Sequence, residues 1–427
     1  MNTLDFRTPI AYIPSKTANP TFLETLQQKS AQALEALSFP TTKDEEWKYT
    51  NLQALTKETY AIGNHQQKTE KDIVSLLLPL EDCFRLVFIN GFFQPHLSSS
   101  LESQKGISIM PLATAFTQKT EIVAQYMAQA LAGKDEYFTA MNTILAKEGV
   151  FIHLEANVQL EKPIVLYALA DSGQEANASL IRNLIVAEKN SQVTFIEKFD
   201  ALGDHYHFDN TLTEFYVQES AIVQHYLLQT SGAKRYQIHH TQVHQQKHSN
   251  FTNYTFSFEG AVIRNNLNLL LDGEFCEGNM FGLYKLEGKS HVDNHTSVDH
   301  LRPNCQSNEF YKGVLSDYSK AVFNGKIYVR PQAQKTNAYQ QNRNVLLSEH
   351  ASVNAKPQLE IWADDVKCSH GAATGKLNED ALFYLRARGI EEQTAKVLLV
   401  QAFANEVVEK IPIVAIKDYL HRLIDTV

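Results

Sequence analysis

Residues 291–390 read HVDNHTSVDHLRPNCQSNEFYKGVLSDYSKAVFNGKIYVRPQAQKTNAYQQNRNVLLSEHASVNAKPQLEIWADDVKCSHGAATGKLNEDALFYLRARGI. Up to Val366 the stretch consists of short apolar or alternating segments separated by Asn, Gln, Ser and Gly, a pattern typical of β-strands and turns. From Asn378 onward the apolar residues recur at helical spacing. The strand pattern extends upstream to about Gly149, so the chain divides into a strand-rich body and a helical tail.

The strand-rich body has no helical period over more than 200 residues. Its segments include FIHLEANVQL, PIVLYAL, SLIRNLIVAE, SQVTFIEKF, AIVQHYLLQ, YQIHHTQVH and SNFTNYTFSFEG. Ser191, Ser220 and Ser249 recur at comparable corners, 29 residues apart, whereas Ser319 and Ser352 are 33 apart. A sandwich or barrel would accommodate so many strands. The loosely periodic corners favour a parallel β-helix, in which stacked coils share one continuous core.

Residues 1–148 are expected to form a mainly helical N-terminal domain. Asn19 can cap a first helix and Pro20 suits its first position. The apolar face of this helix consists of Phe22, Leu23, Leu26, Ala33, Leu34 and Leu37, and Phe39-Pro40 ends it. A second helical stretch covers residues 112–145. Between them, the segment from Arg85 to Phe93 runs into an Asn-Gly turn, which predicts a hairpin.

Trp47 and Tyr49 lie among charged residues in TTKDEEWKYTNLQAL, residues 41–55. Aromatic side chains bury readily, so this segment is interpreted as an anchor that pins a loop to the body. A recognition or gating segment is the alternative.

Residues 376–427 are expected to form a C-terminal helical domain, which leaves 149–375 as the β-helix. Asn378 can cap a first helix and Gly389 can end it. The helix from Glu391 to Lys410 is apolar on two sides, with Ala395, Leu398, Ala402 and Phe403 on one and Val397, Val400, Ala404 and Val408 on the other. A third helix carries Ile416, Leu420, Leu423, Ile424 and Val427 on one stripe. Either all of this is internal core, or one face packs on the body and another meets a partner chain.

Composition excludes several classes of protein. The net charge of −9 and the scattered basic residues argue against nucleic-acid binding. No window approaches 18 consecutive apolar residues, and the first residues lack the features of a signal peptide, so neither a membrane span nor secretion is expected. Four cysteines without a CxxC pair fit a reducing compartment, which predicts a cytoplasmic location.

No common catalytic motif is present. Gly288-Lys289-Ser290 would need a glycine at position 283 to form a phosphate loop, and that residue is Leu283. GxSxG, HExxH and a helix-opening GxGxxG are also missing, so hydrolase, zinc-protease and Rossmann interpretations have no support.

Two histidine clusters are candidate metal sites. His239, His240, His244 and His248 form one, and His291, His295 and His300 form the other. Along a strand, positions 240, 244 and 248 spread over roughly 26 Å, too far for one ion. These histidines are therefore expected to be satisfied by neighbouring side chains.

Cys368-Ser369-His370 is a different arrangement. In an extended segment, residues i and i+2 project to the same side, and thiolate and imidazole are both suitable ligands for iron and zinc. Two ligands cannot complete a four-coordinate site, so a metal or cluster held here needs ligands from a second chain. A simple packed pair remains the alternative.

Four stretches carry a resemblance: KDEEWKYTNL, SNEFYKGVLSDYSKAVFNGKIYV, QKTNAYQQNRNVLLSE and KCSHGAATGKLNEDALFYLRARGI. They resemble the SufD branch of the SufB/SufD family, whose members are subunits of the SufBCD iron–sulfur cluster assembly complex. The Trp-Lys-Tyr-Thr entry and the Cys-Ser-His ending are similar to SufD rather than SufB, and the resemblance covers nearly the whole chain.

The resemblance implies a mainly β protein with a right-handed parallel β-helix core and helical domains at both ends. It implies a non-catalytic scaffold that pairs with SufB through the β-helix and binds the SufC ATPase through the C-terminal helices. A nascent, transient Fe–S cluster would be shared with SufB at His370, and Cys368 matches the family's neighbouring cysteine. Residues expected to meet SufC are Leu382, Phe383, Val397, Val400, Phe403, Ala404 and Val408.

Two other functions stay open at this point. β-Helices also host polysaccharide lyases, which need a groove of acidic and basic residues across successive coils. A self-associating structural protein is the third possibility, and a homodimer of the isolated chain is compatible with an unpaired β-helix surface.

Overall fold

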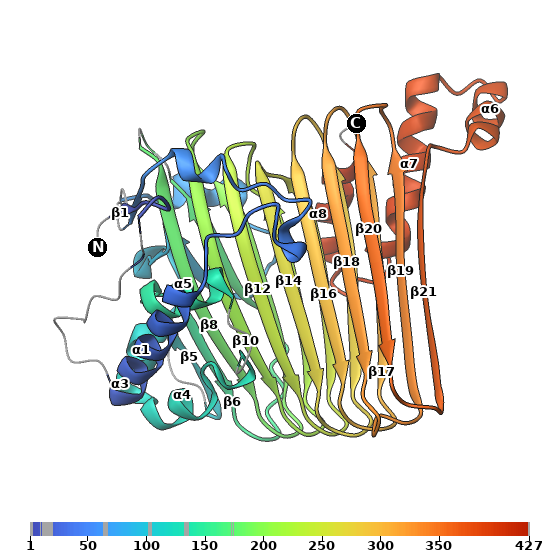
Figure 1. Ribbon diagram of the computed structural model, residues 1–427. Coiled ribbons are helices and arrows are strands. Elements are labelled where there is room, and N and C mark those ends of the chain that lie inside the picture. Colours follow the sequence, from blue (N-terminus) through green and yellow to red (C-terminus); the bar gives the residue numbers. More distant parts are fainter. Residues whose placement is uncertain are drawn as a thin grey trace.

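The computed structural model describes residues 3–8, 10, 20–62, 67–100, 105–131, 136–171, 173 and 175–425. Two parallel sheets face each other and are built from alternate strands of the chain (Figure 1). The chain follows one sheet, crosses to the other and advances by one strand on each return, in a right-handed sense (Figure 1). The expected parallel β-helix core with helices at both ends is confirmed.

The strands of the β-helix are long and regular. Sheet A contains β6 (Val150–Leu154), β8 (Asn177–Ala187), β10 (His207–Val217), β12 (Arg235–Gln245), β14 (Val262–Leu271), β16 (His291–His300), β18 (Lys320–Val329) and β20 (Ser352–Ile361). Sheet B contains β7 (Ile164–Ala170), β9 (Gln192–Ala201), β11 (Ile222–Thr230), β13 (Asn250–Glu259), β15 (Glu277–Leu286), β17 (Gln306–Leu315), β19 (Thr336–Leu346) and β21 (Val366–Gly375).

The core between the sheets is a continuous stack of apolar side chains. Phe195, Phe215, Phe251 and Tyr311 belong to it and are almost fully buried. Helices also cover parts of the outer faces, so many strands are buried on both sides and show little alternation in sequence.

The corner between sheets A and B repeats a left-handed backbone position. Asn190, Ser220, His248, Phe275, Asn304 and Lys335 occupy it, with φ between 57° and 63°. Ser191 and Ser249 follow this position, whereas Ser220 occupies it, so the three serines are not equivalent. Ser319 and Ser352 lie at the opposite edge of the stack, where the chain returns to sheet A. The serine spacing therefore indicated the correct fold, although the serines do not all occupy the same position of the coil.

The N-terminal region contains more strand than expected. Its elements are β1 (Thr3–Leu4), α1 (Thr21–Ala36), β2 (Tyr60–Ile62), α2 (Glu70–Ile73), β3 (Phe84–Ile89), β4 (Phe92–Phe93), β5 (Ile107–Pro111), α3 (Leu112–Gln118), α4 (Thr120–Tyr126) and α5 (Tyr137–Leu145). β2 and β3 extend sheets A and B by parallel pairing with β8 and β7. The long helix expected over 112–145 is divided into three.

The predicted hairpin and the existence of the first helix are confirmed, but the predicted position of Pro20 is wrong. β3 and β4 form a hairpin around Asn90-Gly91, both of which have positive φ. α1 follows Pro20, which takes the N-cap position rather than the first helical one, and Asn19 lies outside the described residues.

Trp47 anchors its loop to the body of the protein, which confirms the first of the two interpretations. Its ring lies 4.4 Å from the Arg264 guanidinium and 5.6 Å from the Phe138 ring. The Thr50 hydroxyl, nearby in the chain, is hydrogen-bonded to the Asp293 carboxylate, which also pairs with Arg264 at 2.7 Å. Residues 45–50 are thereby fixed across the outer face of sheet A.

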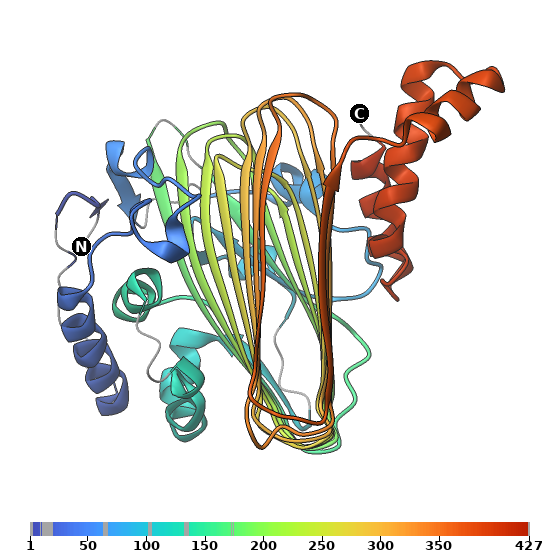
Figure 2. The ribbon, with the colours of Figure 1, turned by 45° about the vertical axis from the view of Figure 1, so that its right-hand side comes forward.

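The C-terminal tail forms α6 (Glu379–Ala387), α7 (Glu392–Val408) and α8 (Val414–Ile424). The Asn378 side chain caps α6 by accepting from the Ala381 amide at 2.9 Å, and Gly389 follows the helix with φ 86°. The N-terminal and C-terminal helices lie on opposite sides of the β-helix, and α6 projects beyond its end (Figure 2). The stripe on α8 is confirmed at Ile416, Leu420 and Ile424; Val427 lies outside the described residues.

Candidate functional site

The last coil of the β-helix is open. β20 and β21 each pair with one neighbouring strand and form the adjacent ends of the two sheets (Figure 1). Most of their side chains are exposed, in contrast to the fully buried strands of the first coils. Such an edge presents unpaired backbone N–H and C=O groups, which can pair with a strand of another chain.

Cys368 and His370 both occupy inward-facing positions of β21 at this open end. Their register partners on β19 are Ala338 and Gln340, which are buried between the sheets. Cys368 is half-buried against a small apolar cluster with Val366, and burial raises the pKa of its thiol. His370 is exposed. The structure therefore places the two predicted ligands on the inward face of one strand, with His370 more exposed than Cys368.

A cleft of about 540 Å³ opens beside His370, between the outer face of sheet B and α7. Phe281, Phe310 and Tyr339 line it from the sheet, and Glu406 and Lys410 line it from the helix. The cleft also reaches Ser369, His370 and Gly371 of the last coil.

A buried carboxyl group lies two coils beneath His370. Glu309 on β17 is 1% exposed, and its Oε2 accepts a hydrogen bond of 2.7 Å from the Gln340 amide nitrogen. Burial raises the pKa of Glu309 to about 7. Glu309 and Gln340 were not predicted from the sequence, because their alignment with His370 depends on turn lengths that the strand pattern alone does not give.

Within the described residues, no group of three or more His, Cys, Asp or Glu side chains has a geometry that could hold a metal ion.

Histidines of both clusters have polar partners, but neither ring nitrogen of His239 makes a hydrogen bond within the described residues. His239 lies inside the β-helix, 3.2 Å from Glu197, and His244 contacts Asp272 at 3.2 Å. His291 contacts Thr50 at 2.9 Å, and His300 contacts Ser307 at 2.9 Å. Burial lowers the pKa of His239 to about 4 and that of His300 to about 3, so both rings are neutral near pH 7.

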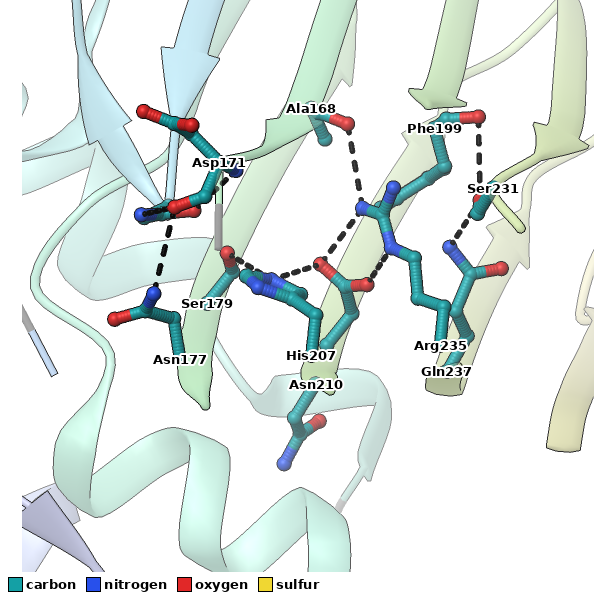
Figure 3. A network of polar contacts seen from close by, with 12 residues as sticks. Ala168, Asp171, Asn177, Ser179, Phe199, His207, Asn210, Ser231, Arg235 and Gln237 are labelled. Atoms are coloured by element: carbon teal, nitrogen blue, oxygen red, sulfur yellow. Dashed lines mark hydrogen bonds and ion pairs between the residues drawn. The ribbon is translucent and has the colours of Figure 1, made fainter. Parts of the chain in front are cut away.

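A second buried polar network occupies the opposite part of the stack (Figure 3). The Arg235 guanidinium pairs with the Asp209 carboxylate, and His207 lies 3.3 Å from that carboxylate and 2.8 Å from the Ser179 hydroxyl. Gln237 donates to the Ser231 hydroxyl at 3.0 Å. These residues come from β8, β10 and β12 and the nearby turns, so the network joins early coils and lies several strands away from His370.

The C-terminal helices dock on sheet B through one face of α7. Ala404, Val407 and Val408 pack with Tyr254 and Leu283 of the sheet. The buried Lys312 ammonium group donates to the Phe403 carbonyl at 2.8 Å and pairs with Glu406 at 2.9 Å.

The docking of α7 on sheet B changes which of its residues are available to a partner protein. Val400, Ala404 and Val408 were expected to meet a second protein, but they are at most 1% exposed because the chain itself covers them. Leu382, Val397 and Phe403 are half-buried, and Phe383 is 74% exposed. Tyr384 and Leu398, which were not selected from the sequence, are 59% and 41% exposed. The accessible apolar surface is thus on α6 and the outer side of α7.

No helix among the described residues is both long enough and apolar enough to cross a membrane.

Comparison with known proteins agrees with these observations. The family model for the SufBD core domain of the SUF system for FeS cluster assembly matches residues 169–403, and the model for the SufBD N-terminal region matches residues 9–166. An iron–sulfur cluster assembly SufBD family protein of Synechocystis is 32% identical over 93% of this chain and 89% of its own length. The iron–sulfur cluster assembly protein SufD of Escherichia coli is 31% identical, over 90% of this chain and 88% of its own. The Bacillus subtilis SufD is 27% identical, with 96% and 95% covered. The chain belongs to the SufBD family of iron–sulfur cluster assembly proteins.

Proposed function

We propose that this chain is a scaffold subunit, without catalysis of its own, that assembles iron–sulfur clusters together with a SufB-type subunit. The observation that carries the proposal is the open last coil, where β20 and β21 each have one free edge and the inward face of β21 holds Cys368 and His370. A second β-helix can continue the stack by adding strands to β20 and β21. Ile361 and Trp362, 40% and 48% exposed at the rim, supply apolar area for such a contact.

The proposed cluster site lies between the two subunits. His370 offers an imidazole nitrogen, and a cysteine of the SufB-type subunit supplies a thiolate. Cys368 has a secondary role, because it packs against a small apolar cluster that includes Ala338, and the raised pKa of its thiol disfavours the deprotonated form that binds metal. The cluster is cargo rather than a resident cofactor. A site completed only by two chains can release it when the chains separate or shift.

A SufC-type ATPase is the proposed second partner, and α6 with the outer side of α7 is the proposed surface. Phe383, Tyr384 and Leu398 are exposed apolar side chains on these two helices. Large exposed side chains grouped in this way are typical of protein-binding surfaces. Since α7 is fixed to sheet B by Lys312, movement of the ATPase subunit would be transmitted to the β-helix next to His370.

The cluster site is tested by anaerobic co-expression with SufB-type and SufC-type subunits. His370→Ala is expected to leave the complex intact and to abolish build-up of the visible absorbance of the cluster. His96→Ala, which removes an exposed histidine of the N-terminal region, is the matched control and should behave as the wild type. Equal cluster build-up in wild type and His370→Ala contradicts the proposed site.

The interface is tested separately by co-purification. Trp362→Glu places a charge at the rim of the open coil and should prevent recovery of the SufB-type subunit. Val74→Glu, at a residue of the N-terminal region that is 59% exposed, is the control and should leave recovery of the SufB-type subunit unchanged. Full recovery with Trp362→Glu contradicts pairing through this end.

A further inference from the structure

The inward row that ends at His370 is continuous through sheet B. It consists of Phe195, His225, Asn253, Met280, Glu309, Gln340 and His370, each in register with the next. Register neighbours in parallel strands lie about 4.8 Å apart, so their side chains stack directly upon one another. A polar atom of the Gln340 side chain that faces the open end therefore faces His370.

Gln340 is 3% exposed, and the two ends of its amide differ. The nitrogen donates to Glu309 in the coil beneath at 2.7 Å. The oxygen has no hydrogen-bond partner among the described residues. A buried carbonyl without a donor costs roughly 1–3 kcal/mol, so a nearby N–H group would be bound favourably.

Gly325 on β18 makes room for this amide. A Cβ atom at position 325 would lie 2.2 Å from the Gln340 nitrogen, which is far inside van der Waals contact. The Gln340 amide occupies the space left by the missing side chain of Gly325, and its hydrogen bond to Glu309 fixes its position. Its oxygen is the polar atom that remains available to the coil above.

The same row already contains an imidazole bound to an amide. His225 and Asn253 are register neighbours, and the Asn253 amide nitrogen lies 2.9 Å from Nδ1 of His225. A histidine and a carboxamide on successive coils of this row are thus within hydrogen-bonding reach of each other. His370 and Gln340 repeat this pairing at the open end, with the histidine on the later coil.

We infer that Gln340 is a positioning residue for His370: its carbonyl oxygen accepts a hydrogen bond from one ring N–H and directs the other ring nitrogen toward an incoming metal ion. This inference rests on the proposed function and adds the group that orients the ligand. A histidine that binds metal through one nitrogen donates its other N–H to a carbonyl or carboxylate in most metal sites, which fixes the ring and its tautomer.

The tautomer gives a test that does not depend on cluster assembly. The complex with the SufB-type subunit is prepared with ¹⁵N-labelled histidine in this chain, and the His370 signals are assigned by their loss in His370→Ala. The wild type should show one dominant tautomer. In Gln340→Leu the tautomer ratio should fall about fivefold, as expected for the loss of one hydrogen bond of about 1 kcal/mol. Gln340→Glu keeps an acceptor and should restore the ratio.

Metal affinity gives the second measurement, with Co²⁺ as the probe under anaerobic conditions. Gln340→Leu should weaken Co²⁺ binding by the complex about 10-fold or more, as is typical for groups that orient a ligand. Gln237→Leu is the matched control, because Gln237 is a buried, inward-facing glutamine whose oxygen also lacks a hydrogen-bond partner among the described residues. It belongs to the polar network of the early coils (Figure 3), several strands away from β21.

The outcomes separate the two proposals. If Gln340→Leu and Gln340→Glu both match the wild type in tautomer ratio and Co²⁺ affinity while His370→Ala loses Co²⁺, the positioning role is overturned and the proposed site stands. If His370→Ala leaves Co²⁺ affinity unchanged, the proposed site itself fails. Thermal unfolding of each variant shows whether the β-helix is intact.

Discussion

Replacement of Glu309 by Gln should change how the stability of the protein depends on pH. Burial raises the pKa of this carboxyl group from 4.5 to about 7 in the folded state. Because the folded pKa lies above the unfolded one, Glu309 favours folding fully below about pH 4.5, and this contribution is lost as the pH rises through 7. At about 1.4 kcal/mol per pKa unit, the shift corresponds to about 3 kcal/mol.

Glutamine has nearly the same shape and carries no charge at any pH, so Glu309→Gln should not show this loss. It can still accept the hydrogen bond from the Gln340 nitrogen. We expect the free energy of unfolding of the variant, relative to the wild type, to rise by about 3 kcal/mol between pH 4 and pH 8.

Urea unfolding followed by circular dichroism over this pH range measures the difference. The pKa values of His239 and His300 are lowered by burial, which makes the wild type more stable as the pH rises to about 6.5. Both proteins share these histidines, so their effect cancels in the difference. Glu349→Gln, at an exposed residue, is the control variant and is measured in the same way. A difference between Glu309→Gln and wild type that stays constant, or falls, from pH 4 to pH 8 would refute the reasoning.

Three further predictions concern the surfaces that flank the β-helix. Lys312→Met should leave the Phe403 carbonyl without its donor and remove the 2.9 Å pair with Glu406, which keeps a 3.8 Å contact with Arg343. Docking of α7 should weaken by about 2 kcal/mol, seen as roughly 30-fold faster hydrogen exchange in the second half of the helix. Trp47→Ala should lower the free energy of unfolding by about 2–3 kcal/mol in urea titrations, because the ring loses its contacts with Arg264 and Phe138. Phe383→Ser should leave that free energy unchanged, since the ring is 74% exposed, but should weaken binding of the SufC-type subunit about 10-fold or more by calorimetry.

The fold could be predicted from the sequence because every coil of the β-helix repeats the same sequence pattern. Short buried segments with polar corners recur over the body, and the resemblance to the SufB/SufD family agreed with this pattern. The pair Cys368 and His370 could also be found, because the alternation of side chains in a strand places i and i+2 on one side.

The interior row beneath His370 could not be predicted. Positions 309, 340 and 370 are 31 and 30 residues apart, whereas the serine corners suggested 29, so the alignment appears only once every turn length is known. The face of α7 was also misassigned at Val400, Ala404 and Val408. Both sides of that helix are apolar, and the sequence does not say which of two apolar faces meets the sheet.

The central claim is that His370 binds the cluster at an interface between this chain and a SufB-type subunit. Pulsed electron paramagnetic resonance of the reduced nascent cluster, in a complex whose ¹⁵N-histidine label is confined to this chain, tests it most directly. We predict hyperfine coupling to one histidine nitrogen, which is lost in His370→Ala and kept in His96→Ala. A cluster without ¹⁵N coupling in the wild type, or with the same coupling in His370→Ala, would contradict the account.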